Sequence, residues 1–204
     1  MPALWKSSHP ALSPREAEFV TGSSRKAIQQ AIDRKEVRTL PSREGGTRER
    51  LLAYPDLLYL RLRGKVGRLL SAQGKRKLRQ KLGAAGTEMR NRGAITVDEL
   101  EISVAPDVKQ LKERLARVEG VRLHVVSDPA VRGGEPVVAG TRVPVHMLAE
   151  LGAQGATREE LLQDYPSLTP ESLEAALLYA RMYPRRGRPR RAPWANGVVV
   201  SRPS

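Results

Sequence analysis

Closely spaced helix-start signals constrain this chain most, because each one opens a helix of only a few turns. In "SPRE", Ser13 is positioned to cap, Pro14 is the first helical residue and Glu16 the third, which is the capping-box pattern. "TREE" repeats the box at Thr157, and "TPE" opens another helix at Thr169. Aromatic residues make up only 4% of the chain, with a single Phe. We therefore expect a mainly α fold with small β elements, built from compact modules with aliphatic cores.

Positive charge is concentrated at the two ends of the chain. Residues 1–92 carry a net charge of +13, residues 93–180 one of −6, and residues 181–204 one of +7, within a total of +14. This balance favours a polyanionic partner, namely nucleic acid, a membrane surface or an acidic protein. The chain has no cysteine, so thiol and disulfide chemistry is excluded. Because the sequence has no apolar leader and no run approaching the ~20 residues of a membrane span, we expect a cytoplasmic protein without a membrane partner.

A helix-turn-helix pattern occupies the first sixty residues. One helix runs through Val20 and ends at Gly22, and Ser24 caps a second helix that reaches about Arg34. The apolar residues of the second helix form one stripe, and its opposite face carries Arg25, Lys26, Gln29 and Gln30. Arg and Gln both make bidentate contacts with base edges in the major groove of DNA. This face is therefore a candidate DNA-reading surface, and a merely solvated helix face is the alternative.

The segment "VRTLPSREGGTRERLLAY" predicts a hairpin with arms at Val37–Leu40 and Arg48–Ala53 around a Gly-Gly tip. Its arginines, which include Arg43 and Arg48, suit a wing that lies against phosphates or a minor groove. With "TGSSR" before the second helix and "YPDLLYLRL" after the hairpin, residues 11–62 resemble winged helix-turn-helix domains of the MerR and excisionase type. This resemblance implies DNA binding through Arg25, Lys26, Gln29, Gln30, Arg43 and Arg48.

Two further segments separate this pattern from the C-terminal half. A trailing helix, broken near Gly64 and Gly74, completes a predicted domain at residues 11–86. Its lysines and arginines between positions 75 and 81 are either solvated or in contact with phosphates. Residues 93–126 predict a small α+β connector, with strands before a helix that opens at Pro106 and another strand at Val121–Val126.

Residues 127–183 predict a hairpin, with extended pieces at Glu135–Ala139 and Thr141–Val143, followed by three helices in a homeodomain-like arrangement. The motifs "DPAVRGGEPVVAGTRVPV", "GATREELLQDYPSLT" and "AALLYA" resemble the antitoxin domain known as domain of unknown function 433. With the N-terminal pattern and the basic tail, the chain resembles a long VapB-type antitoxin. The resemblance implies a PIN-like ribonuclease toxin as partner, repression of its own operon through operator DNA, and a homodimer formed through residues 127–183.

Residues 184–204 form an arginine-rich tail with interleaved prolines, a composition that cannot build a core alone. A basic tail of this kind can also grip nucleic acid. The antitoxin resemblance implies instead that an arginine enters the acidic metal site of the toxin, since its planar charged fork suits clustered carboxylates. Trp194 would anchor the segment as an interface hot spot. The candidate toxin-binding residues are Tyr183, Arg185, Arg186, Arg188, Arg190, Arg191 and Trp194.

Catalytic signals are absent from the sequence. His9, His124 and His146 lack metal-ligand spacing, and the glycine turns match neither a Walker A loop nor a dinucleotide fingerprint. We therefore expect a protein that is not an enzyme and that needs no cofactor or metal. The alternative to an antitoxin is a stand-alone transcriptional regulator whose basic tail holds nucleic acid.

Overall fold

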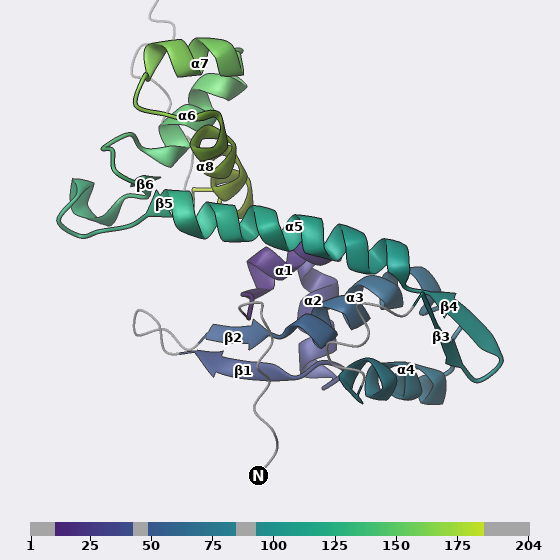
Figure 1. Cartoon of the computed structure of the whole chain (residues 1–204). Coiled ribbons are helices and arrows are strands. Elements are labelled where there is room, and N and C mark those ends of the chain that lie inside the picture. The colour runs from purple at the N-terminus through teal and green to yellow at the C-terminus, as the bar shows by residue number, and fades with distance from the viewer. Residues whose placement is uncertain (1–10, 43–48, 85–92, 186–204) are drawn as a thin grey trace, which may run out of the picture.

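The computed structural model describes residues 11–42, 49–84 and 93–185, in which short helices dominate and the strands form three two-stranded antiparallel sheets (Figure 1). The N-terminal elements are α1 (Pro14–Thr21), α2 (Arg25–Asp33), β1 (Thr39–Ser42), β2 (Glu49–Leu52), α3 (Tyr54–Val66) and α4 (Ala72–Ala84). The remaining elements are β3 (Ala94–Val97), β4 (Leu100–Ser103), α5 (Ala105–His124), β5 (Val125–Val126), a 3₁₀ turn (Arg132–Gly134), β6 (Val137–Val138), α6 (Val145–Ala153), α7 (Arg158–Asp164) and α8 (Pro170–Met182). The predicted class, mainly α with small β elements, is confirmed. Within these ranges, no helix combines the length and the apolar character that crossing a bilayer demands.

The predicted helix caps are present. The Ser13 side chain accepts a hydrogen bond from the backbone N–H of Glu16, and the Glu16 carboxylate accepts one from the backbone N–H of Ser13 at 2.8 Å. Gly22 ends α1 in the left-handed region at φ 72°, where glycine carries no steric penalty. Thr157 and Glu160 form the same reciprocal box at the start of α7. Local chemistry therefore fixes where these helices begin.

The helix breaks predicted near Gly64 and Gly74 are only partly right, because the structure has a single break that lies between these two glycines. Gly64 and Gly74 lie inside α3 and α4, and the chain bends between Val66 and Ala72 instead. Gly67 caps α3, its N–H donating to the Arg63 carbonyl at 2.9 Å. Gly74 is buried, and a Cβ there would lie 3.3 Å from a methyl carbon of Leu70. This glycine allows close packing and does not break its helix.

The predicted strand at Val121–Val126 is also wrong for its first four residues, because α5 continues to His124 and the strand keeps only Val125–Val126. The reason is packing. A buried stripe of Val108, Leu111, Leu115, Val118 and Val121 continues at helical spacing through Gly120. Core contacts on that stripe favour helix where the β-branched residues alone suggest a strand.

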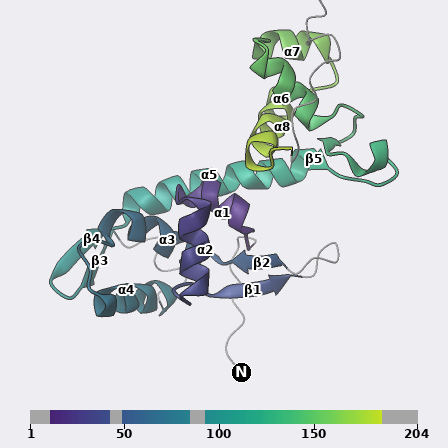
Figure 2. The same ribbon diagram turned by 180° about the vertical axis from the view of Figure 1, so that it is seen from behind.

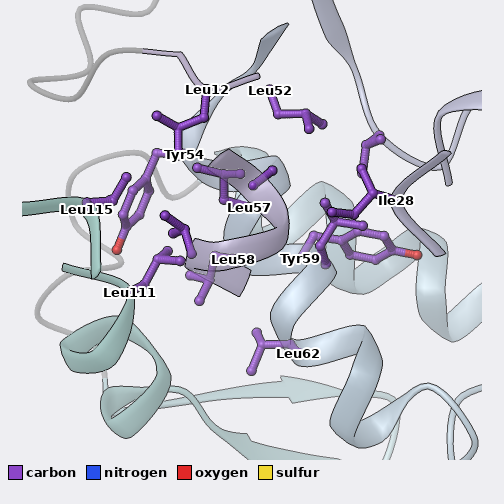
Figure 3. Close-up of a cluster of buried hydrophobic side chains, with 14 of the residues drawn as sticks. Leu12, Ile28, Leu52, Tyr54, Leu57, Leu58, Tyr59, Leu62, Leu111 and Leu115 are labelled. Atoms are coloured by element: carbon purple, nitrogen blue, oxygen red, sulfur yellow. The ribbon is translucent and has the colours of Figure 1, made fainter. Parts of the chain in front are cut away.

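The helix α5 is the longest in the described ranges and runs alongside both halves of the molecule (Figures 1 and 2). At one end, Leu111 and Leu115 pack with Tyr54 and Leu58 of α3 (Figure 3). The same core continues to Ala175, Leu178 and Met182 of α8. A second core, which includes Val145, Leu148, Leu161 and Leu173, joins α6, α7 and α8. The first core therefore includes residues from all three predicted domains, 11–86, 93–126 and 127–183. The division of the chain into these domains stays a prediction.

The C-terminal half contains the three helices expected from the sequence, α6 to α8, preceded by β6. The extended pieces meet in a tight turn, in which the N–H of Val138 donates to the carbonyl of Val143 at 3.0 Å and Val137 bridges to Pro144. The strand β6 also pairs with β5, with Val125 opposite Val138. This small sheet ties the end of α5 to the start of the three-helix unit.

Candidate nucleic-acid interface and tail root

The helix α2 is amphipathic, as its sequence predicts. Ile28, Ala31 and Ile32 are buried against the first core. Four predicted DNA-reading side chains, Arg25, Lys26, Gln29 and Gln30, are all exposed on the opposite face. The structure thus brings them together on the solvent side of one short helix.

Two of these four side chains are already engaged within the chain. The Arg25 Nε lies 3.4 Å from Oε2 of Glu18, and its backbone N–H donates to the other carboxylate oxygen at 3.1 Å. The Gln29 side-chain amide donates to Asp33 at 2.8 Å. Among the described residues, Lys26 and Gln30 make no side-chain hydrogen bond or ion pair with another residue. The face therefore presents two restrained side chains and two that are available to a ligand.

The hairpin lies beside this helix. Arg50 of β2 is 4.0 Å from the Asp33 carboxylate at the end of α2. Leu12, just before α1, pairs through its backbone with Leu52 at distances of 2.8 and 2.9 Å, which joins the hairpin to the first helix. The predicted wing residues Arg43 and Arg48 fall outside the described residues.

Buried ionisable groups support the base of the hairpin. Asp56, in the first turn of α3, accepts a hydrogen bond from the backbone N–H of Arg38 at 3.0 Å. Burial raises the pKa of the Asp56 carboxyl, and this hydrogen bond together with the Arg79 charge opposes the rise. Burial also raises the pKa of the Tyr59 hydroxyl, beside the Glu36 carboxylate. These groups hold the strand that leads into the hairpin against α3.

Most basic side chains of α4 have structural partners. Lys77 forms an ion pair with Asp98, Lys81 donates to the carbonyl of Thr96 at 2.6 Å, and Arg79 donates to the carbonyl of Lys35 at 3.1 Å. They fasten α4 to the β3–β4 hairpin and to the residues after α2. Lys75 and Arg76 carry the remaining charges of this run on the helix surface.

A buried ion pair that the sequence did not reveal connects α3 with α5. The Nε of Arg61 lies 2.7 Å from Oδ1 of Asp107, and both side chains are less than a tenth exposed. Lys65 lies 2.7 Å from the same oxygen, and Arg61 also donates to Gln110. The one local signal is an arginine inside the apolar run "LLYLRL"; its partner is 46 residues away and cannot be read from spacing.

The helix α5 also makes polar contacts with α1. Arg114 donates to the carbonyl of Phe19 at 2.9 Å, and the guanidinium of Arg117 lies 5.7 Å from the centre of the Phe19 ring. Arg122 places two nitrogens 3.0 and 2.9 Å from the carboxylate of Glu16. The capping acid of α1 is therefore also an anchor for α5.

The residues that directly follow α8 contact both the N-terminal and the C-terminal half of the molecule. Tyr183 stacks on Tyr179 with 4.8 Å between ring centres, and its hydroxyl lies 3.3 Å from the hydroxyl of Ser13. Arg15 of α1 lies over the Tyr183 ring at 5.4 Å. Arg185 forms ion pairs with Glu135 and Glu150. The other predicted toxin-binding residues, Arg186, Arg188, Arg190, Arg191 and Trp194, fall outside the described residues.

The histidine at position 146 lies next to this tail root. Its ring meets the edge of Tyr179 with 6.0 Å between centres. Burial, followed by the charge of Arg185, lowers the pKa of the His146 imidazole. The described part of the chain contains no group of three or more His, Cys, Asp or Glu side chains able to hold a metal ion.

Comparison with known proteins identifies one part of the chain. Residues 125–180 match the family model described as "Protein of unknown function (DUF433)". The uncharacterized protein y4eO of Sinorhizobium fredii is 42% identical over 91 residues, which cover 45% of this chain and 41% of that protein. The chain thus spans about two fifths of the length of this curated relative.

Two solved structures also match. A DUF433 member from Anabaena variabilis is 36% identical, with a TM-score of 0.30 over 37% of this chain and 75% of that one. Rv2018 from Mycobacterium tuberculosis is 17% identical, with a TM-score of 0.34 over 85% of this chain and 99% of that one. The sequence match over β5, β6 and the three C-terminal helices shows that residues 125–180 of this chain are a DUF433 domain.

Proposed function

We propose that this protein is a DNA-binding antitoxin that represses its own operon and restrains a PIN-like ribonuclease. In this proposal α1, α2 and the β1–β2 hairpin act as a winged helix-turn-helix, with α2 in the major groove. The observation that carries the proposal is the exposed polar face of α2, which lies beside the hairpin at the basic end of the chain.

The contacts on α2 suggest different roles for its side chains. Lys26 and Gln30 are available to reach phosphates and base edges, and glutamine suits a bidentate contact with adenine. Arg25 is partly neutralised by Glu18, so its guanidinium is held in place before any DNA arrives. Phosphate contacts set the register of such a complex, and base contacts set its specificity.

A mobility-shift assay with the DNA upstream of the protein's own gene tests this role. Replacing Arg25, Lys26, Gln29 and Gln30 together with alanine should abolish the shifted complex, because each good base contact contributes about 1–3 kcal/mol of discrimination. The matched control replaces the exposed Arg158 of α7 and Arg181 of α8 with alanine, which removes the same number of positive charges as the quadruple variant does. Equal affinity of the quadruple variant and the wild type would contradict the proposal.

The antitoxin half of the proposal is supported by the composition of the tail. After Ala180 the chain has seven arginines and no acidic residue. A segment with this basic, proline-interleaved composition suits a channel lined by metal-binding carboxylates, from which one arginine would exclude the metal. Ribonuclease inhibition is the assay: a chain ending at Tyr183 should lose inhibition, and Trp194→Ala should weaken it by about 2 kcal/mol if this side chain is a hot spot. Inhibition by the shortened chain equal to that of the full chain would contradict this half.

The proposal includes a homodimer formed through residues 127–183, so that two α2 helices reach two half-sites. Sedimentation of the full chain should then give a dimer at micromolar concentration. A monomer that still binds its promoter and has no ribonuclease partner would favour the alternative, a stand-alone regulator.

A further inference from the structure

The exit of the chain from α8 is fixed at two neighbouring points. We propose that Glu135 and Glu150 form a latch for Arg185, which holds the root of the arginine-rich segment on the DUF433 domain until an acidic partner takes that arginine. The inference deepens the proposed antitoxin function and rests on it for the nature of the partner.

The first point is the latch itself. Glu135 comes from the turn before β6 and Glu150 from α6, and the Arg185 guanidinium reaches both, with 3.3 Å between Nη1 and Oε1 of Glu150. Glu135 is shared, because Arg132 also lies 2.9 Å from its Oε2. The hydrogen bond from Arg132, with the Arg185 charge adding to it, lowers the pKa of the Glu135 carboxyl. Glu135 therefore stays ionised and able to hold Arg185 well below neutral pH.

The second point is Tyr183, two residues earlier. Its ring stacks on Tyr179 of α8, the guanidinium of Arg15 in α1 lies over the same ring, and its hydroxyl is 3.3 Å from that of Ser13. Pro184 stands between the two contacts and restricts φ there, which limits how the chain can swing. The segment from 183 to 185 is thus a short, restrained arm with Arg185 at its end.

Solvent exposure makes the latch weak enough to open. The side chains of Arg185 and Glu150 are 53% and 59% exposed, and only Glu135, at 22%, is well covered. Exposed ion pairs of this kind contribute little each, so the latch changes the affinity for a competing acidic ligand by about three- to tenfold. A carboxylate-lined site can therefore take Arg185, and in doing so it leaves Glu135 and Glu150 without this partner.

His146 reports on whether the latch is closed: burial lowers the pKa of its imidazole most, the Arg185 charge lowers it further, and Glu135 and Glu150 raise it. An NMR titration of the full chain should show a higher His146 pKa in Arg185→Gln than in the wild type. Arg181→Gln, at an exposed position on α8, is the matched control and should leave the His146 pKa unchanged. The same His146 pKa in Arg185→Gln and the wild type would overturn the latch.

A second measurement tests the competition, with poly-L-glutamate as the acidic probe. The double variant Glu135→Gln/Glu150→Gln should bind the probe about three- to tenfold more tightly than the wild type. In an Arg185→Gln background, the same two changes should produce a clearly smaller gain. An equal gain in both backgrounds would show a general charge effect and overturn the proposal.

These outcomes are separate from those of the proposed function. A protein that shows the latch in both measurements but does not inhibit the ribonuclease keeps the latch and loses the antitoxin role. A protein that inhibits the ribonuclease with an unchanged His146 pKa in Arg185→Gln keeps the antitoxin role and loses the latch.

Discussion

Asp107 joins α5 to α3 through its buried ion pair with Arg61. Asp107→Asn keeps the size of the side chain but removes the charge that Arg61 faces at 2.7 Å. Because a buried charge is then left without its partner, we expect the free energy of unfolding to fall by about 3–5 kcal/mol. Urea denaturation followed by circular dichroism measures this loss. Asp98→Asn, which breaks the half-exposed pair with Lys77, should cost less than about 1 kcal/mol, and equal losses would argue against a buried pair.

Asp56 makes stability depend on pH in the opposite sense to a salt-bridged acid. Burial raises the pKa of the Asp56 carboxyl in the folded state above its ordinary value of 3.8. The fold therefore favours the protonated form, so the contribution of Asp56 to stability is fully present below its unfolded-state pKa and is lost as the pH rises through its folded-state pKa. Asp56→Asn keeps an oxygen that can accept from the Arg38 N–H and has no charge to bury. Relative to the wild type, the variant should gain stability at neutral pH, and the gain should vanish below the unfolded-state pKa. A loss that grows toward neutral pH would contradict this.

Individual residues differ in how far the sequence revealed them. The exposed face of α2 was predictable, because a buried stripe on a short capped helix determines what lies opposite. The partners of Arg61 and Tyr183 were not, since they lie 46 and 170 residues away and no local pattern encodes such pairs. The two acids that hold Arg185 were missed for the same reason.

At the scale of the element, the starts of helices were easier to predict than the places where helices break. Side-chain caps predicted the starts of α1, α2, α7 and α8 correctly, because an N-cap is a local hydrogen bond. Breaks were predicted near Gly64 and Gly74, and a strand was predicted directly after Gly120, yet all three glycines lie within helices. Tertiary packing decides these positions, and it outweighs the low helix propensity of glycine.

A pair of substitutions tests this interpretation. At Gly120 a Cβ would meet nothing within 4 Å, so Gly120→Ala should stabilise the protein by about 0.5–1 kcal/mol through better helix propensity. At Gly74 the added Cβ would lie 3.3 Å from both Leu70 and Asp98, so Gly74→Ala should gain less or lose stability. Thermal or urea unfolding of both variants measures these changes in stability. Destabilisation by Gly120→Ala would mean that α5 breaks where the sequence alone suggests.

At the scale of the whole molecule, α5 connects two ends with different chemistry. The basic N-terminal half contacts it through Arg61, Phe19 and Glu16, while α8 of the DUF433 domain packs along its other end (Figure 2). The uneven distribution of charge could be read from the sequence. The continuous core that joins the two halves could not be predicted from it. That core depends on apolar residues of α8 meeting α5, a contact between distant segments.

The central proposal is that α2 binds DNA in a sequence-specific way. Its most direct test is to measure the protein's affinity for its own promoter and for a scrambled duplex over a range of salt concentrations. Both affinities should fall as salt rises, because phosphate contacts release counterions. The promoter should remain tighter by about 10³-fold or more at every salt concentration. Lys26→Ala should reduce the salt dependence, and Gln30→Ala should reduce the preference for the promoter. Equal affinity for the two duplexes at every salt concentration would contradict the account.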